Sequence, residues 1–339
     1  MKKIPIGIDD FKKLMENDAY YVDKTEFISE ILDDGAEVKL FTRPRRFGKT
    51  LNMSMLKYFF DIDNAEENRK LFSELDIEKS EYFSEQGQYP VIFISLKGIK
   101  SNCWEECLFD LKSLISNLYN EFEFVRASLN ESELKEFNKI WFKKDDGEYK
   151  NALRNLTAYL YRHYKKEVIL LIDEYDSPLI SAYEHHYYND AVTFFKVFYG
   201  EALKTNQYLK MGVMTGIIRV IKAGIFSDLN NLKVYSILNE QYSNFFGFTE
   251  AEVKKALCDF NIEYKLSDVK SWYNGYKFGN SEVYNPWSIL NFLRDKKLAP
   301  NWVDTSGNFL INDILKNIDT DTMETLERLF MGESVEENI

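Results

Sequence analysis

Short apolar runs alternate with longer stretches of helical periodicity along the first two thirds of the chain. The runs at 91–96 and 168–172 are almost continuously apolar, as is typical of parallel strands that are covered on both faces. The pattern predicts five strands in all, at 38–42, 91–96, 168–172, 211–215 and 234–238. Because strands that alternate with helices form parallel sheets, we predict a doubly wound α/β domain.

Helical patterns fill the intervals around the predicted strands. Apolar residues recur at helical spacing in 104–124 and 149–164. Before the first strand, Asp23 is followed three residues later by Glu26, and this acidic start predicts a helix through Ile31. We therefore expect helices to cover both faces of the sheet.

The pattern changes near residue 243, where we predict a domain boundary. The predicted parts are an α/β domain, a mostly helical domain and a frayed acidic tail, at 1–243, 244–331 and 332–339. The capping-box spacing from Thr249 to Glu252 predicts that the second domain begins with a helix to about residue 260. Turns are expected within this domain at 274–275, 279–280 and 285–286.

The segment after the first predicted strand carries a phosphate-binding motif. It contains Gly48-Lys49-Thr50, the end of the Walker A pattern G-x-x-x-x-G-K-[ST], directly before a helical pattern at 51–60. Phosphates need backbone N–H groups and the positive end of a helix, and Gly48 allows a close backbone approach. Lys49 can reach the β- and γ-phosphates, and the Thr50 hydroxyl can ligate Mg²⁺. Arg43 replaces the first glycine of the pattern.

A second motif follows the apolar run at 168–172. The run ends in Asp173 and Glu174, as in a Walker B motif. Asp173 can hold Mg²⁺ through water, and Glu174 can polarise an attacking water molecule. Gly-Lys-Thr by itself also occurs at ordinary helix starts, and two acids by themselves also occur in solvated turns. The two motifs together favour a nucleotide site.

The next predicted strand adds two candidates. Thr215 ends that strand and can contact the γ-phosphate, although a β-branched residue is also an ordinary strand residue. Arg219 follows one turn later and can pair with a phosphate or with an acid.

These motifs predict ATP and Mg²⁺ as cofactors. We expect the catalytic residues to be Glu174, Lys49 and Thr215. We expect the metal ligands to be Thr50 and Asp173. We expect the nucleotide to contact Arg45, Arg46, Phe47, Gly48, Lys49, Thr50 and Leu51. Three arginines within the four positions from 43 to 46 would repel one another without an anion, which also favours nucleotide at this loop.

Further segments match one family in consistent order. They are 21–25, 43–50, 171–176, 215–216, 227–232, 272–276, 284–288 and 305–308. In these segments the chain resembles the AAA-ATPase-like family of bacterial and archaeal P-loop proteins, which are commonly fused to a C-terminal PD-(D/E)XK nuclease-like domain. The resemblance implies an ASCE-type P-loop NTPase core followed by a helical, winged-helix-like lid. It also implies that Arg43 is a feature of the family.

The nuclease-like domain is not visible in the sequence. The E-x-K spacing occurs at 133–135 and at 252–254, in helical contexts that lack the preceding strand and Asp, and we interpret it as coincidence. We therefore expect the chain to be a natural short form or a fragment.

Composition and charge narrow the function classes. Hydrophobic residues make up 45% of the 339 residues, enough for a sizeable core. With 43 Lys and Arg against 55 Asp and Glu, the net charge of −12 opposes contact with nucleic acid or anionic membrane except at a local basic patch. Three cysteines favour a reducing compartment, and the sequence shows neither a signal peptide nor a run that could span a bilayer. We expect a cytoplasmic protein.

The leading hypothesis is a Mg²⁺-dependent ATPase whose hydrolysis rearranges the helical domain or a partner. The alternatives are a nucleotide-gated interaction module with little turnover, and the ATPase part of a nuclease-linked DNA-processing or defence system. Glu174 favours the enzyme, because a binding module needs no general base there. The expected partner is ATP, with a second copy of the chain, a partner protein and nucleic acid left open.

Overall fold

The computed structural model describes residues 2–219, 226, 229–301, 325 and 328. Contacts group residues 1–302 into one compact unit and 303–339 into another. The acidic tail at 332–339 and the family segment at 305–308 lie outside the described residues, as do positions 227 and 228.

A five-stranded parallel sheet lies at the centre of the first unit, in the order β2-β3-β4-β1-β5. The strands are β1 Val38–Thr42, β2 Val91–Ser95, β3 Val168–Asp173, β4 Leu209–Gly216 and β5 Leu232–Tyr235. All five predicted strands are present, which confirms the α/β core. The fifth ends earlier than predicted, because the side chain of Asn239 accepts the N–H of Ser236 and turns the chain there, leaving Leu238 68% exposed.

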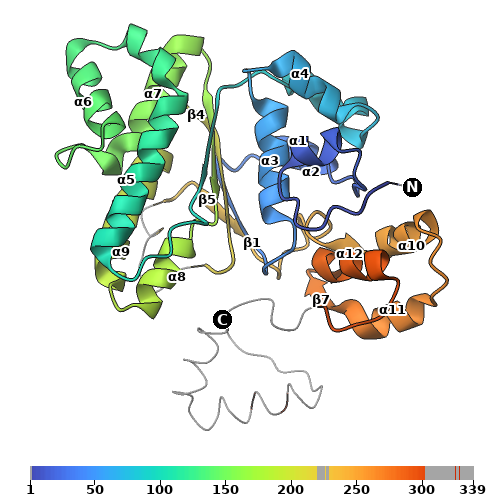
Figure 1. Ribbon diagram of the computed structural model, residues 1–339. Coiled ribbons are helices and arrows are strands. Elements are labelled where there is room, and N and C mark those ends of the chain that lie inside the picture. The colour runs from blue at the N-terminus through green and yellow to red at the C-terminus, as the bar shows by residue number, and fades with distance from the viewer. Residues whose placement is uncertain (1, 220–225, 227–228, 302–324, 326–327, 329–339) are drawn as a thin grey trace. The chain divides into compact units, whose positions relative to one another are not determined.

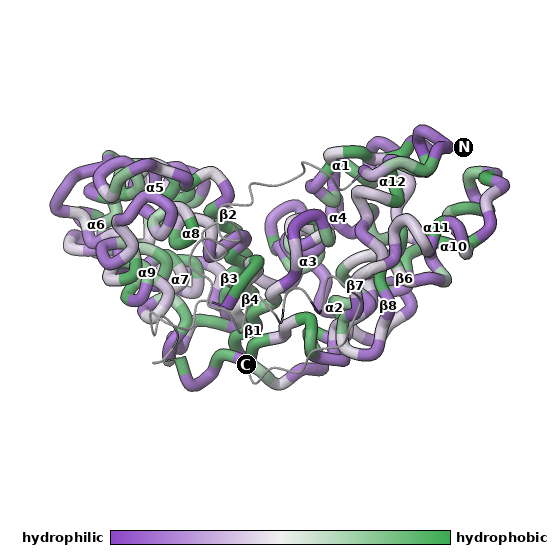
Figure 2. Tube along the Cα trace, turned by 90° about the horizontal axis from the view of Figure 1, so that it is seen from below, coloured by the Kyte–Doolittle hydropathy of each residue, from purple (hydrophilic) through white to green (hydrophobic). Residues whose placement is uncertain are grey.

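Helices cover both faces of the sheet, as the strand pattern predicts (Figure 1). On one side lie α1 Phe11–Glu16, α2 Glu26–Asp33, α3 Lys49–Phe60 and α4 Ala65–Arg69. On the other side lie α5 Trp104–Glu121, α6 Glu131–Trp141, α7 Ala152–Tyr164, α8 Ser177–Glu184 and α9 Tyr188–Leu203. Consecutive residues of β1 alternate between the two layers, with Leu40 in the α5–α9 cluster and Phe41 in the cluster around α3. Figure 2 shows the hydrophobic strands between the two helical layers.

The predicted helices have slightly different ends in the structure. α2 begins at Glu26, with Thr25 as its N-cap, two residues later than the predicted cap at Asp23. The carboxylate of Asp23 accepts the N–H and the hydroxyl of Thr25 and forms no capping box. The pattern at 104–124 ends as a 3₁₀ turn, and the pattern at 149–164 begins as one. The 3₁₀ helices are η1 Lys70–Phe72, η2 Asp76–Lys79, η3 Glu81–Glu85, η4 Glu123–Ser128 and η5 Tyr149–Asn151.

Between residues 244 and 301, the described part of the second predicted domain, the chain forms three helices and a small sheet that the sequence pattern does not predict. In chain order its elements are β6 Phe248–Thr249, α10 Glu250–Asp259, α11 Leu266–Tyr273, β7 Asn274–Phe278, β8 Ser281–Tyr284 and α12 Pro286–Asp295. The three strands pair antiparallel in the order β6-β8-β7. We call β6 to α12 the C-terminal elements.

Two details of this region test the sequence pattern. The capping box from Thr249 to Glu252 is confirmed at the start of α10. The turn predicted at 279–280 is confirmed, and Gly279 has a φ of 51° that suits a glycine. Residues 274–275, also predicted as a turn, instead begin β7. The C-terminal elements supply most of a third hydrophobic cluster, which also includes Tyr20, while Phe278 and Val283 belong to the cluster around α3. The boundary near residue 243 stays a prediction.

Candidate functional site

The loop from Arg43 to Gly48, called the phosphate loop below, joins β1 to α3. Gly48 is the N-cap of α3 with a φ of 79°, and no side chain caps the helix. The first N–H groups of α3 therefore remain available at the positive end of the helix dipole. Such an end suits a phosphate group.

Lys49 lies across this loop. Its ammonium donates hydrogen bonds to the carbonyl oxygens of Arg43, at 3.0 Å, and Pro44, at 2.9 Å. Burial lowers the pKa of Lys49, while the acids at 176, 174 and 173 oppose the shift. The lysine is therefore held over the loop and close to three carboxylates.

Three predicted site residues meet at the carboxyl edge of the sheet, with Asp173 and Thr215 at the ends of β3 and β4 and Thr50 in the first turn of α3. β4 lies between β1 and β3, so Thr215 stands beside Asp173. The carboxylate of Asp173 accepts hydrogen bonds from the hydroxyls of Thr50, at 2.9 Å, and Thr215, at 2.5 Å. The Ser95 hydroxyl, at the end of β2, is 3.4 Å from the same carboxylate. Asp173 is fully buried, so these hydroxyls supply the hydrogen bonds that a buried charge needs.

Glu174 follows in a left-handed backbone conformation, with a φ of 52°. Its N–H points to the hydroxyl of Thr215, 3.4 Å away. Burial raises the pKa of Glu174, as does the charge of Asp173, while Lys49 and the lysines at 97 and 100 oppose the rise. A carboxylate with a raised pKa accepts a proton more readily, which suits a general base.

Sequence reasoning did not assign a role to two further residues at this site. The carboxylate of Asp176 accepts the N–H groups of Ile217, at 2.7 Å, and Ile218, at 2.9 Å, and so holds the chain after β4. Lys97 lies two residues after β2 and its charge acts on Glu174. Both residues closely follow strands that end at this edge of the sheet. Their place in the sequence, just after a predicted strand, is the signal that could have identified them.

The other predicted contact residues have different placements. Arg45 is exposed, Leu51 is half-buried, and Arg219 is exposed shortly after β4. Arg46 is exposed, and Phe47 is fully buried with its ring turned toward the C-terminal elements, so only its backbone can serve a phosphate.

The donor set fits a magnesium ion bound together with phosphates. The Thr50 hydroxyl and the Asp173 carboxylate are oxygen donors held side by side, the kind that Mg²⁺ prefers. In the described part of the chain, no group of three or more His, Cys, Asp or Glu side chains could hold a metal. A magnesium ion here would therefore rely on phosphate oxygens and water for its remaining ligands.

Known proteins are similar to this chain over most of its length. The model of a family described as Predicted AAA-ATPase matches residues 5–226. An uncharacterized protein encoded in the vnfD 5′ region of Azotobacter chroococcum mcd 1 is 27% identical over 316 residues. That alignment covers 93% of this chain and 56% of the relative, so the chain spans about half of the relative's length. Among the described residues, no helix is long and apolar enough to cross a membrane.

Proposed function

Because the chain belongs to the predicted AAA-ATPase family, we propose that it binds ATP with Mg²⁺ at the phosphate loop and hydrolyses it. The observation that carries the proposal is the contact of Thr50 and Thr215 with one buried carboxylate, that of Asp173, beside Glu174. Membership of the family supports nucleotide binding in general. Magnesium, hydrolysis and the residue roles are our proposal.

Each residue has a separate task in this proposal. Backbone N–H groups from Arg45 to Leu51 bind the phosphates, and the ammonium of Lys49 exchanges its two carbonyl partners for β- and γ-phosphate oxygens. Thr50 and Asp173 hold Mg²⁺, which when bound neutralises phosphate charge. The hydroxyl of Thr215 turns its one proton from Asp173 toward the γ-phosphate.

Glu174 takes the proton of the attacking water in this proposal. Its raised pKa strengthens it as a proton acceptor. The proton of the water molecule therefore ends on the carboxylate of Glu174. The nearby ammonium of Lys49 keeps its positive charge for the phosphates.

We further propose that ATP binding or hydrolysis rearranges the region 244–331, acting as a lid domain. The support is direct contact, because the guanidinium of Arg46 lies 4.1 Å from the ring centre of Trp287 in α12. The same contact favours the second candidate function, a nucleotide-gated interaction module with little turnover, since it links the loop to a helix of the C-terminal elements.

One experiment separates these functions. Binding of ATP is measured by calorimetry, and phosphate release is followed with Mg²⁺ and with EDTA. Mg²⁺-dependent turnover supports the ATPase, whereas tight binding with almost no release supports the switch. Turnover that rises on addition of DNA would favour the nuclease-linked alternative, and absence of both binding and turnover would refute the proposal.

Thermal denaturation gives an independent check. A ligand that binds only the folded state stabilises it by about 2.7 kcal/mol at a hundred times its dissociation constant. Mg-ATP should therefore raise the melting temperature, and the rise should shrink in Arg45→Ala and Arg46→Ala. No shift at saturating Mg-ATP would contradict a nucleotide role for these arginines.

A further inference from the structure

The C-terminal elements contact the phosphate loop directly. The buried ring of Phe47 packs edge-on against the ring of Tyr276, with 4.7 Å between the ring centres. Its centre also lies 5.1 Å from the ring centre of Phe278, and both partners are in β7. Arg46, the neighbouring residue, lies over Trp287. Arg46 has a φ of 67°, a conformation that non-glycine residues rarely adopt. Because such a backbone persists only where its surroundings hold it, these contacts help to fix the shape of the loop.

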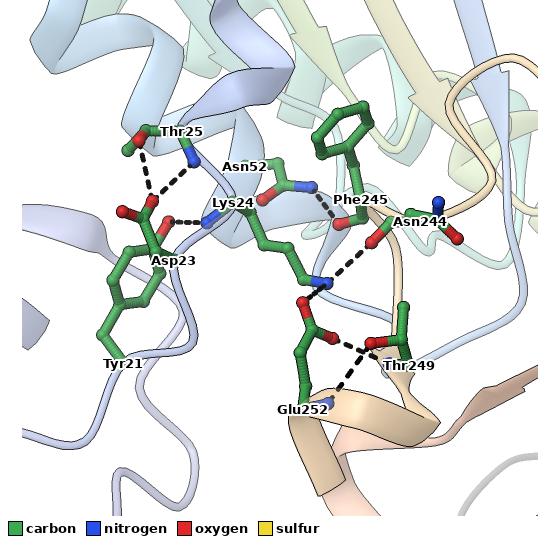
Figure 3. Close-up of polar contacts among 9 residues, drawn as sticks. All are labelled: Tyr21, Asp23, Lys24, Thr25, Asn52, Asn244, Phe245, Thr249 and Glu252. Carbon is green, nitrogen blue, oxygen red and sulfur yellow. Dashed lines mark hydrogen bonds and ion pairs between the residues drawn. The ribbon is translucent and has the colours of Figure 1, made fainter. Parts of the chain in front are cut away.

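Two buried polar side chains hold the segment that leads into these elements. The amide of Asn52, in α3, donates to the carbonyl oxygen of Phe245 at 3.0 Å. The ammonium of Lys24 donates to the carbonyl oxygen of Asn244 at 2.6 Å (Figure 3). The carbonyl groups of residues 244 and 245 are therefore bound by one side chain from α3 and one from the segment before α2.

Lys24 also forms an ion pair with the first turn of α10. Its ammonium is 2.5 Å from one carboxylate oxygen of Glu252 (Figure 3). The other oxygen of Glu252 accepts the N–H of Thr249 at 2.7 Å, which is half of the capping box. One carboxylate therefore both starts α10 and binds Lys24, so a shift of α10 must break the pair or the cap.

The backbone around Lys24 is itself held in place. The hydroxyl of Tyr21 accepts the N–H of Lys24 at 3.2 Å, and Asp23 accepts both donors of Thr25 (Figure 3). Lys24 is only 8% exposed. Burial lowers its pKa and Glu252 opposes that shift, so the ammonium depends on this carboxylate.

We propose that Lys24 and Glu252 are positioning residues for nucleotide binding at the phosphate loop. Their ion pair fixes residues 244–252, and thereby keeps β7 and α12 against Phe47 and Arg46. The inference rests on the proposed function, because it requires that the loop binds ATP. By thermodynamic linkage, attachment of the C-terminal elements and binding of nucleotide then strengthen one another.

The test compares two Lys→Met variants in the full chain. Lys24→Met removes the buried ammonium that pairs with Glu252. Lys254→Met breaks an exposed ion pair with Glu250, and both of these residues lie in α10 beside Glu252. We expect the dissociation constant of Mg-ATP to rise about 5-fold or more in Lys24→Met, within the usual range of coupling between sites. It should stay within about 2-fold in Lys254→Met. Lys24→Arg keeps the charge and should recover most of the affinity.

A second readout separates positioning from general loss of stability. Emission from Trp287, identified by its loss in Trp287→Phe, should change when Mg-ATP is added. In Lys24→Met, the Mg-ATP concentration that gives half of this emission change should rise by the same factor as the dissociation constant. The measurement is made at a temperature where circular dichroism shows that the variant is folded. If Lys24→Met does not fold, Glu252→Gln is tested in its place, and the dissociation constant of Mg-ATP should rise in the same way. This variant keeps the cap of α10, because glutamine can still accept the N–H of Thr249.

The outcomes distinguish the two proposals. A wild-type chain that binds no Mg-ATP refutes the proposed function and the positioning role with it. A wild-type chain that binds Mg-ATP, together with folded Lys24→Met and Glu252→Gln variants of unchanged affinity, overturns the positioning role and leaves the proposed function standing.

Discussion

The guanidinium of Arg43 donates a 2.7 Å hydrogen bond to the carbonyl oxygen of Tyr235, 192 positions later in the chain. It also donates to the carbonyl oxygens of Thr42 and Tyr242, and it lies over the rings of Phe246 and Phe278. Arg43 is fully buried, and its burial lowers the pKa of the guanidinium to about 10. The residue that replaces the first Walker A glycine therefore ties the end of β1 to the end of β5 and to the chain that follows it.

This contact predicts that restoring the general motif harms the fold. Arg43→Gly recreates G-x-x-x-x-G-K-T but leaves buried carbonyl groups without a donor, and Arg43→Lys cannot reproduce the planar fork. We expect each to lower the free energy of unfolding by about 2–5 kcal/mol in denaturant titrations. Arg45→Ala, an exposed neighbour, is the control and should change it by less than about 0.5 kcal/mol without nucleotide. A stable Arg43→Gly variant would contradict this role.

The core of the fold was predictable because its signal is local. β3 is buried at every position, and only a strand covered on both faces gives so continuous an apolar run. The meeting of Thr50, Asp173 and Thr215 was also predictable, since the carboxyl ends of neighbouring parallel strands lie at one edge.

The contacts that hold the C-terminal elements were not predictable in this way. Lys24 and Glu252 are 228 positions apart, and a lysine beside an acid in sequence normally indicates surface. β7 has three exposed residues in succession, so it lacks the alternation that reveals a strand. Only the packing of distant segments decides these features.

The position of Lys49 leads to a prediction about binding. Lys49 is only 7% exposed, and its ammonium bonds to two loop carbonyls, so a nucleotide meets a cation already aimed across the loop. Because hydrogen bonds to charged groups contribute about 1.5–3 kcal/mol, Lys49→Ala should weaken ATP binding by about 10- to 100-fold. Calorimetry measures this, with circular dichroism to show that the variant is folded. Lys57→Ala, later in α3, should bind like the wild type, and equal affinity in Lys49→Ala would move the site elsewhere.

The acidic C-cap of α3 predicts a pH dependence of stability. Asp61 ends that helix, and burial raises its pKa to about 7. The folded state therefore keeps a proton that the unfolded state releases near pH 4, so this group's contribution to stability falls as pH rises from about 4 to 7. Asp61→Asn should raise the free energy of unfolding by about 1–3 kcal/mol at pH 8 and by almost nothing at pH 4. Exposed Asp190→Asn should lack this difference, and a pH-independent effect of Asp61→Asn would refute the assignment.

The proposed chemistry depends on Glu174 more than on any other side chain. Glu174→Gln keeps the shape beside Asp173 and removes the proton acceptor, so ATP should still bind while turnover falls about 10²–10⁴-fold. Asp173→Asn should instead weaken hydrolysis and its Mg²⁺ dependence together, because the carboxylate that receives the Thr50 hydroxyl loses its charge. Phosphate release at several Mg²⁺ concentrations distinguishes the two, with Glu184→Gln at the end of α8 as the control. A non-hydrolysing switch has almost no turnover to lose, and brisk turnover that survives in Glu174→Gln would show that another group accepts the proton.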